Sequence, residues 1–168
     1  MNPVLRTARE KLKNVTPLKR DCGRVCGAAC CRSPEGEETG MLLFPGEEEA
    51  YSGKKGWAVR ETAMGLMVIC PGECERNERP LACCLFPLLP RMGANGEILA
   101  VTDLRAKAVC PLARQGKSAM DPAFIDAVRE TGDLLAKDRE QAAFLNRLEE
   151  EQEELKRLRR ALGGGEGV

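Results

Sequence analysis

Nine cysteines in a chain of 168 residues constrain this protein more than any other feature of its sequence. Four of them fall within ten residues, at Cys22, Cys26, Cys30 and Cys31. The other five are Cys70, Cys74, Cys83, Cys84 and Cys110. Because the chain has no histidine, a site built from its soft ligands would consist of thiolates, which bind zinc and iron–sulfur clusters. The cysteine pattern therefore predicts a metal-binding protein.

Disulfide bonds are the alternative use of these cysteines. The N-terminal residues contain no apolar run long enough for a signal peptide, and no stretch approaches the ~20 apolar residues that span a bilayer. We therefore expect a cytoplasmic protein without a membrane partner, in a compartment where structural disulfides are rare. Nine is also an odd number, so the cysteines cannot all pair with one another.

The composition limits how many large side chains can fill the core and which partners the surface charge can attract. The chain is 43% apolar, but this fraction includes nine cysteines, and only four Phe, one Tyr and one Trp are aromatic. We expect metal–thiolate bonds to replace part of the packing that larger side chains would provide. The 26 basic and 26 acidic residues cancel, which argues against a general electrostatic affinity for nucleic acid.

Hydrophobic patterns predict a small α+β domain that is irregular around the cysteines, with short strands, an N-terminal helix and a C-terminal helical pair. Val4, Leu5, Ala8 and Leu12 share one face of a helix over residues 3–14. The apolar run 65–69 indicates a buried strand. The turn 93–96, Gly-Ala-Asn-Gly, predicts a hairpin that joins residues 88–92 with 98–101.

Two further segments are predicted to be irregular or solvated. Three prolines between residues 80 and 90 favour a rigid, irregular segment over a helix. Glu47, Glu48 and Glu49 suggest the solvated start of a short helix, which we favour over a site for a hard cation.

The first cysteine group is difficult to place on a single metal ion. In a continuous helix, Cys22 and Cys30 would lie roughly 12 Å apart along the axis, too far for one ion. Either the segment is a loop, which its two glycines favour, or different ions take different thiols. Adjacent side chains of an extended chain point apart, so we expect Cys30 and Cys31 to serve different sites, or one of them to bridge.

The character of the chain changes near residue 121. We expect a metal-binding domain over residues 1–120, a helical region over 121–162 and a flexible tail over 163–168. Asp121 followed by Pro122 predicts a helix start. A second helix is predicted over residues 138–162, where leucines recur every seven residues, although Gln141 and Gln152 interrupt its apolar face. The pattern leaves open a coiled coil or a helix packed on its own domain.

Several motifs together resemble a known family. They are Cys22-x3-Cys26-x3-Cys30-Cys31, Leu43-Phe44-Pro45-Gly46-Glu47, Cys70-x3-Cys74, Arg79-Pro80-Leu81-Ala82-Cys83-Cys84-Leu85-Phe86-Pro87 and Cys110-Pro111. Over residues 20–112 the chain is similar to the YkgJ-type cysteine-cluster proteins, also called the CxxCxxCC or putative zinc- or iron-chelating family. The resemblance implies that the cysteines bind metal. Some relatives carry this domain within a flagellin lysine methylase.

The resemblance also implies a ligand set. Cys84 stands where the family usually has arginine, which makes Cys84 the expected non-ligand. The implied metal ligands are Cys22, Cys26, Cys30, Cys31, Cys70, Cys74, Cys83 and Cys110. Eight thiolates suit two four-thiolate sites or one binuclear centre, and neighbouring arginines, among them Arg76 and Arg79, are expected to offset the negative charge.

Three functions stay open at this point. The first is a metal-binding protein that holds zinc or an iron–sulfur centre for a structural or metal-handling role. The second is an iron–sulfur redox or methyl-transfer accessory. The third is a zinc-stabilised interaction module whose C-terminal helix binds a protein partner. No P-loop, G-x-G-x-x-G or G-x-S-x-G motif occurs, and the sequence leaves open whether the chain is an enzyme.

Overall fold

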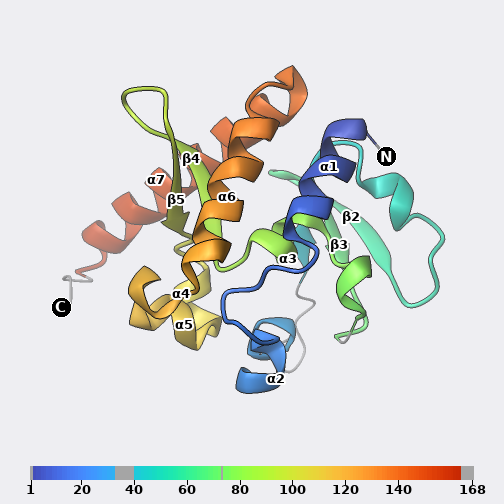
Figure 1. Ribbon diagram of the computed structural model, residues 1–168. Coiled ribbons are helices and arrows are strands. Elements are labelled where there is room, and N and C mark those ends of the chain that lie inside the picture. The colour runs from blue at the N-terminus through green and yellow to red at the C-terminus, as the bar shows by residue number, and fades with distance from the viewer. Residues whose placement is uncertain (1, 33–39, 73, 164–168) are drawn as a thin grey trace.

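The computed structural model describes residues 2–32, 40–72 and 74–163 (Figure 1). This part of the chain is an α+β fold with seven α-helices and two small antiparallel sheets, as predicted. The helices are α1 (Pro3–Leu12), α2 (Cys22–Cys26), α3 (Leu81–Leu85), α4 (Ala106–Val109), α5 (Pro111–Gln115), α6 (Pro122–Leu135) and α7 (Arg139–Ala161). The strands are β1 (Met41–Leu42), β2 (Ala58–Thr62), β3 (Gly65–Ile69), β4 (Leu88–Met92) and β5 (Ile98–Thr102). Of the predicted tail, residues 164–168 lie outside the described residues.

The N-terminal helix is confirmed, and local signals start it. The Asn2 side chain accepts the Val4 N–H at 2.8 Å, which satisfies one of the donors that a helix start leaves unpaired. Pro3 occupies the first turn, where its missing N–H has no consequence. The apolar face buries Leu5 and Leu12 completely in the main core, so α1 is one of the elements that organise the fold.

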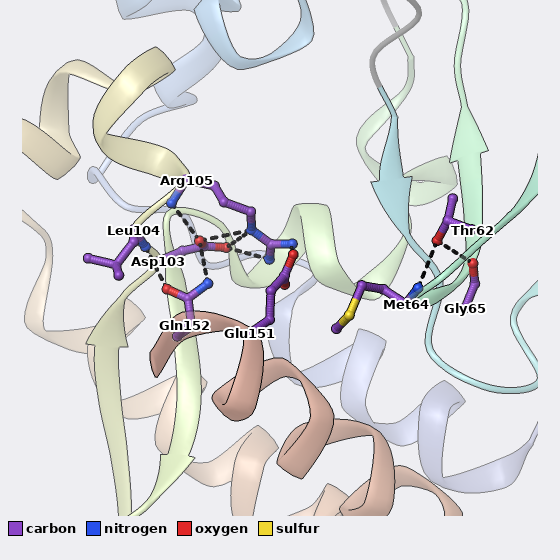
Figure 2. A network of polar contacts seen from close by, with 8 residues as sticks. All are labelled: Thr62, Met64, Gly65, Asp103, Leu104, Arg105, Glu151 and Gln152. Carbon is purple, nitrogen blue, oxygen red and sulfur yellow. Dashed lines mark hydrogen bonds and ion pairs between the residues drawn. The ribbon is translucent and has the colours of Figure 1, made fainter. Parts of the chain in front are cut away.

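The larger sheet has the order β1-β3-β2, and a tight hairpin joins β2 to β3. Thr62 pairs with Gly65 across this turn; its hydroxyl donates to the Gly65 carbonyl at 2.7 Å and accepts the Met64 N–H at 3.2 Å (Figure 2). Gly65 has a φ of 126°, a conformation that favours glycine. Strand β3 is the predicted apolar run, and Cys70 follows its last residue directly.

The second sheet is the predicted hairpin of β4 and β5, and α6 packs against it. The two contact so closely that a Cβ atom on Gly132 would lie 2.5 Å from Pro90 Cβ and 2.6 Å from Ile98 Cγ2. The glycine that weakens α6 as an isolated helix is therefore required for its packing. Figure 1 shows α6 lying across this hairpin, with α1 on its other side.

Helix α7 packs on its own domain through the residues that interrupt its apolar pattern. Gln141 donates to the Pro45 carbonyl at 2.9 Å. Gln152 accepts the Leu104 N–H at 2.8 Å and donates to Asp103 at 3.1 Å (Figure 2). Leu148 is buried in the main core, so this leucine is not available for a coiled coil. A protein partner of α7, which stays a prediction, would find exposed apolar side chains at its C-terminal end, where Leu158 and Leu162 lie.

One main core joins the two regions that the sequence divides near residue 121. Its buried residues come from α1, α3, β4 and β5 on one side of that boundary and from α6 and α7 on the other. At its centre the rings of Phe44 and Phe144 meet edge to face, with centroids 4.9 Å apart. No cysteine belongs to the buried set of this core, although Cys84 packs against it.

The irregular segment predicted between residues 80 and 90 is wrong, because a helix occupies its first half and strand β4 begins at Leu88. Residues Leu81–Leu85 form helix α3, which Pro80 precedes at the cap position. Pro80 and Pro87 delimit this helix and none of the prolines lies inside it, so the helix loses no hydrogen bond to proline. Within the described residues, no helix is long and apolar enough to cross a membrane.

Candidate metal centre

The cysteines lie on four separate segments of the chain. Cys22 and Cys26 are the first and last residues of α2, and Cys30 and Cys31 end the 3₁₀ turn Ala29–Cys31. Cys70 and Cys74 follow β3, Cys83 and Cys84 lie in α3, and Cys110 separates α4 from α5. In Figure 1, α2 lies at the lower end of the molecule beneath α3, and α4 contacts the turn Ala29–Cys31.

The segment that carries the first four thiols is neither the loop that its glycines favoured nor a continuous helix. Asp21 caps α2 by accepting the Gly23 N–H at 3.0 Å. Gly27, with a φ of 63°, ends α2, and Ala28 also has a positive φ, of 53°. This conformation costs an alanine about 1–2 kcal/mol. The two residues reverse the chain, so the helical span that would separate Cys22 from Cys30 does not exist.

All nine thiols line one or both of two adjoining cavities, which share Cys22, Cys30, Cys83 and Arg79 in their walls. The first cavity measures about 210 Å³. Its cysteines are Cys22, Cys26, Cys30, Cys83, Cys84 and Cys110. The second measures about 390 Å³. Its cysteines are Cys22, Cys30, Cys31, Cys70, Cys74 and Cys83. The structure thus brings all eight predicted ligands to one region of the molecule.

The thiols affect one another's pKa values. Burial raises the pKa of Cys22, and the nearby Cys26 and Cys110 raise it further. Burial likewise raises the pKa of Cys74, as do Cys70 and Cys31, whereas Arg79 lowers it. Repulsion between thiolates raises thiol pKa values in this way when several ionisable sulfurs lie close together. A bound cation would instead lower the pKa values of these thiols.

The half-buried Cys83 and the exposed Cys30 show the same effect. Burial raises the pKa of Cys83 strongly, with additional contributions from Cys84 first and then from Cys31, Cys70 and Cys74. The hydrogen bond with Cys31 raises the pKa of Cys30. The sulfur atoms of Cys30 and Cys31 lie 4.0 Å apart.

Of the arginines that the sequence placed near the ligands, Arg79 and Arg76 have different roles. Arg79 lines both cavities, and its hydrogen bond to Cys74 and its positive charge both lower the pKa of that thiol. Its Nε is buried without a hydrogen-bond acceptor among the described residues. Arg76 instead donates to the carbonyls of Leu12, Lys13 and Val15, where it caps the end of α1.

Glu47 is the important residue that sequence reasoning missed, because the prediction of a solvated glutamate at this position is wrong. Glu47 is fully buried and accepts the N–H groups of Phe44 at 3.0 Å and of Leu81 at 2.9 Å. Arg9 lies 3.4 Å from the same carboxylate and also donates to the Tyr51 hydroxyl at 3.1 Å. Burial raises the pKa of Glu47, against the opposing effect of these donors. The carboxylate therefore holds the first residue of α3, two residues before Cys83.

The donor chemistry of this region fits a thiophilic metal, but a coordination sphere is not formed. None of the nine cysteines forms a disulfide bond. Within residues 2–32, 40–72 and 74–163, no three Cys, Asp or Glu side chains are arranged as ligands of one metal ion. The predicted turn between Cys70 and Cys74 includes Glu73, which lies outside the described residues. The ligand set therefore stays a prediction that the convergence of the thiols supports.

No family model matches this chain, and neither a curated protein nor a solved structure matches it. The resemblance to the YkgJ-type family accordingly rests on the motifs of the sequence alone.

Proposed function

We propose that this protein binds a thiophilic metal, zinc or an iron–sulfur centre, through eight of its nine cysteines. The observation that supports the proposal is the convergence of thiols from four separate segments on two adjoining cavities. A chain that used its cysteines only as small apolar residues would bury them in the main core, yet none belongs to its buried set. When bound, the metal would link the four segments to one another.

Residues of the chain around the thiols suit this role. Arg79 supplies a positive charge and N–H donors next to Cys74, as the outer partners of metal ligands commonly do. Among the residues that the structure describes, its buried Nε has no hydrogen-bond acceptor, and a metal-bound thiolate would provide one. Glu47 fixes the start of α3, so the Cys83 thiol is presented from a helix whose position does not depend on the metal.

The test is metal analysis of protein purified anaerobically with a reductant. We expect zinc in a colourless protein, or iron and sulfide in a brown one with the absorption of thiolate-ligated clusters. Cys74→Ser should lower the metal content, whereas Cys84→Ser, the matched control, should leave it unchanged. Wild-type protein that retains neither zinc nor iron after reconstitution with both would refute the proposal.

The identity of the metal also separates the candidate roles. Iron would support the redox or methyl-transfer accessory, because iron–sulfur clusters transfer electrons and zinc does not. Zinc would support a structural role or an interaction module. The cytoplasmic location predicted from the sequence belongs to the same proposal, since thiolate centres of either kind require a compartment that keeps cysteine reduced.

A further inference from the structure

The second half of α7 carries its charges in a definite order. Residues 150–154 include four glutamates, residues 156–160 include three arginines and a lysine, and Leu155 lies between the two blocks. Reversing the order of this segment about Leu155 exchanges each acid with a base: Glu150 with Arg160, Glu151 with Arg159, Glu153 with Arg157 and Glu154 with Lys156. Two such helices that lie side by side in opposite directions are therefore complementary in charge.

The helix dipole does not account for this arrangement. A helix favours negative charge in its first turn, and the effect falls off beyond that turn. Because α7 begins at Arg139, Glu150 lies about three turns from its start. The acidic block is thus in a position where the dipole of its own helix offers little stabilisation.

Contacts within the chain use only half of these charges. Glu151 pairs with Arg105 at 3.1 Å and Glu153 pairs with Lys156 at 2.6 Å, while Arg159 donates to the Leu104 carbonyl at 3.1 Å. In the part of the chain that the structure describes, the other four form no ion pair or hydrogen bond and are exposed: Glu150, Glu154, Arg157 and Arg160. Two acids and two bases of the segment are therefore left to solvent.

These charges lie on the outer side of α7. Leu148 and Gln152 are buried on the side that packs on the domain. Glu150 and Glu154 each follow two residues later, about 200° around the helix, and so point away from the domain. The groove on this outer side is lined, among the described residues, only by side chains of α7, which include Leu158. Figure 1 shows these C-terminal turns at the edge of the molecule, where a second helix has access to them.

The same turns expose apolar side chains. Leu158 is 51% exposed and Leu162 is 85% exposed. With the partly buried Leu155, these residues have the alternating spacing of three and four that apolar positions of paired helices have. Leu148 begins this pattern in the core of the domain, but the domain no longer covers the pattern at its C-terminal end. A second helix would remove this apolar surface from water.

We infer that two copies of this protein associate through the C-terminal halves of their α7 helices, which pack antiparallel about Leu155. In this arrangement Glu154 of each copy lies beside the partner's Arg157, and Glu150 beside the partner's Arg160. A two-fold axis forms every such pair twice, so the charges that lack a partner within one chain gain one in the dimer. Parallel pairing would instead place acid opposite acid, which repulsion opposes.

The inference goes beyond the proposed function and does not depend on a bound metal. The contact runs over residues 149–162, about 20 Å of helix, and its area falls at the low end for protein interfaces. We therefore expect a reversible dimer with a dissociation constant of about 10 μM to 1 mM. Since α7 is already held on its domain by Gln152, little further ordering opposes the association.

Sedimentation of the full-length protein at increasing concentration, with a reductant to exclude disulfide-linked dimers, tests the inference. The charge-reversal variants Glu150→Lys/Glu154→Lys and Arg157→Glu/Arg160→Glu should each associate at least tenfold more weakly than the wild-type protein, because like charges then face each other. An equimolar mixture of the two variants should associate again, since the new lysines of one face the new glutamates of the other. Mixing would not repair a variant that had merely failed to fold.

Two further variants separate charge from apolar contact. Glu61→Lys/Asp133→Lys reverses two exposed acids outside α7 and should leave the association unchanged. Leu158→Ser removes an apolar contact from both copies and should weaken the association about tenfold. Raising the salt concentration from about 0.05 M to about 0.5 M should weaken the wild-type dimer severalfold, because its exposed ion pairs are screened.

Three results would overturn the inference. They are a wild-type protein that stays monomeric up to about 1 mM, a dimer that both charge-reversal variants retain, and a mixture of these variants that fails to associate. The first would leave the outer face of α7 to a different partner, and the second would place the dimer interface elsewhere. Metal content measured on the same samples keeps this test distinct from that of the proposed function.

Discussion

We expect Glu47→Gln to destabilise the protein by about 2–4 kcal/mol, although the substitution changes neither the volume nor the shape of the side chain. The reason is the number of donors around this carboxylate. The N–H groups of Phe44 and Leu81 and the guanidinium of Arg9 all point at its two oxygens, and the side chain is fully buried. A glutamine keeps only one of these two acceptors.

The magnitude follows from the contacts that are lost. In either orientation of the amide, one backbone N–H faces an NH₂ group and stays unpaired in the interior, which costs about 1–3 kcal/mol. Arg9 also loses its charged partner, and its side chain is only 16% exposed, so water replaces the interaction incompletely. For a chain of this length, the combined loss should lower Tm by roughly 4–16 °C.

The chain contains a reporter for this measurement. Trp57 is its single tryptophan, and its ring centroid lies 5.0 Å from that of Tyr51. The Tyr51 hydroxyl accepts from Arg9 and donates to the Glu78 carbonyl, so it belongs to the network around Glu47. Urea unfolding followed by tryptophan fluorescence should give a lower midpoint for Glu47→Gln with an unchanged m-value.

A surface glutamate provides the control. Glu61 lies exposed on β2, and Glu61→Gln should change the free energy of unfolding by no more than about 0.5 kcal/mol. If Glu47→Gln unfolds at the same urea concentration as this control, the three donors do not depend on the carboxylate, and Glu47 does not hold the start of α3.

Four further outcomes are expected. Gly132→Ala should destabilise by about 1–3 kcal/mol in urea unfolding, because the new Cβ collides with Pro90 and overpacking outweighs a helix-propensity gain of about 1 kcal/mol. Gln152→Ala should cost about 1–3 kcal/mol and increase amide hydrogen exchange at Leu104, whose N–H it leaves unpaired. Arg79→Gln should weaken metal binding about 10–100-fold in competition with a chelator, with little change in the stability of the metal-free protein. Metal removal under reducing conditions should lower Tm but preserve most far-UV helical signal, since the main core buries no cysteine.

Elements with strong local signals could be predicted from the sequence. The turn at residues 93–96 and the helix starts at Asp121 and Asp138 depend on contacts within a few residues, so the sequence alone contains the information. The cap at Asp121 is as expected, since its side chain accepts the Ala123 N–H at 3.0 Å. Asp138 caps α7 in the same way by accepting the Glu140 N–H at 3.0 Å. For the candidate site, cysteine spacing predicted that the thiols would converge, because their number and type left few other uses.

Elements that depend on distant partners could not be predicted. Glu47 is followed by two further acids and has the pattern of a solvated helix start, and only its position beside Leu81 makes it a buried acceptor. Gln152 interrupts an apolar face, and only the backbone of Leu104 explains why it is buried. Strand β2 was missed for a similar reason, since its register with β3 forms it and its own pattern alternates weakly.

Long polar side chains therefore determine where three of the cysteine-bearing segments lie. Glu47 holds the start of α3, which carries Cys83; Arg76 ties the segment after Cys74 to the end of α1; and Gln152 holds Leu104, just ahead of α4 and Cys110. Buried backbone outside helices and sheets needs such side-chain partners, because its N–H and C=O groups have no regular hydrogen bonds of their own. None of these bonds involves a thiol, so three walls of the cavities are positioned independently of any ion. The ordering that a metal adds then falls chiefly on α2 and the turn Ala29–Cys31, the segment in which Ala28 keeps its strained positive φ.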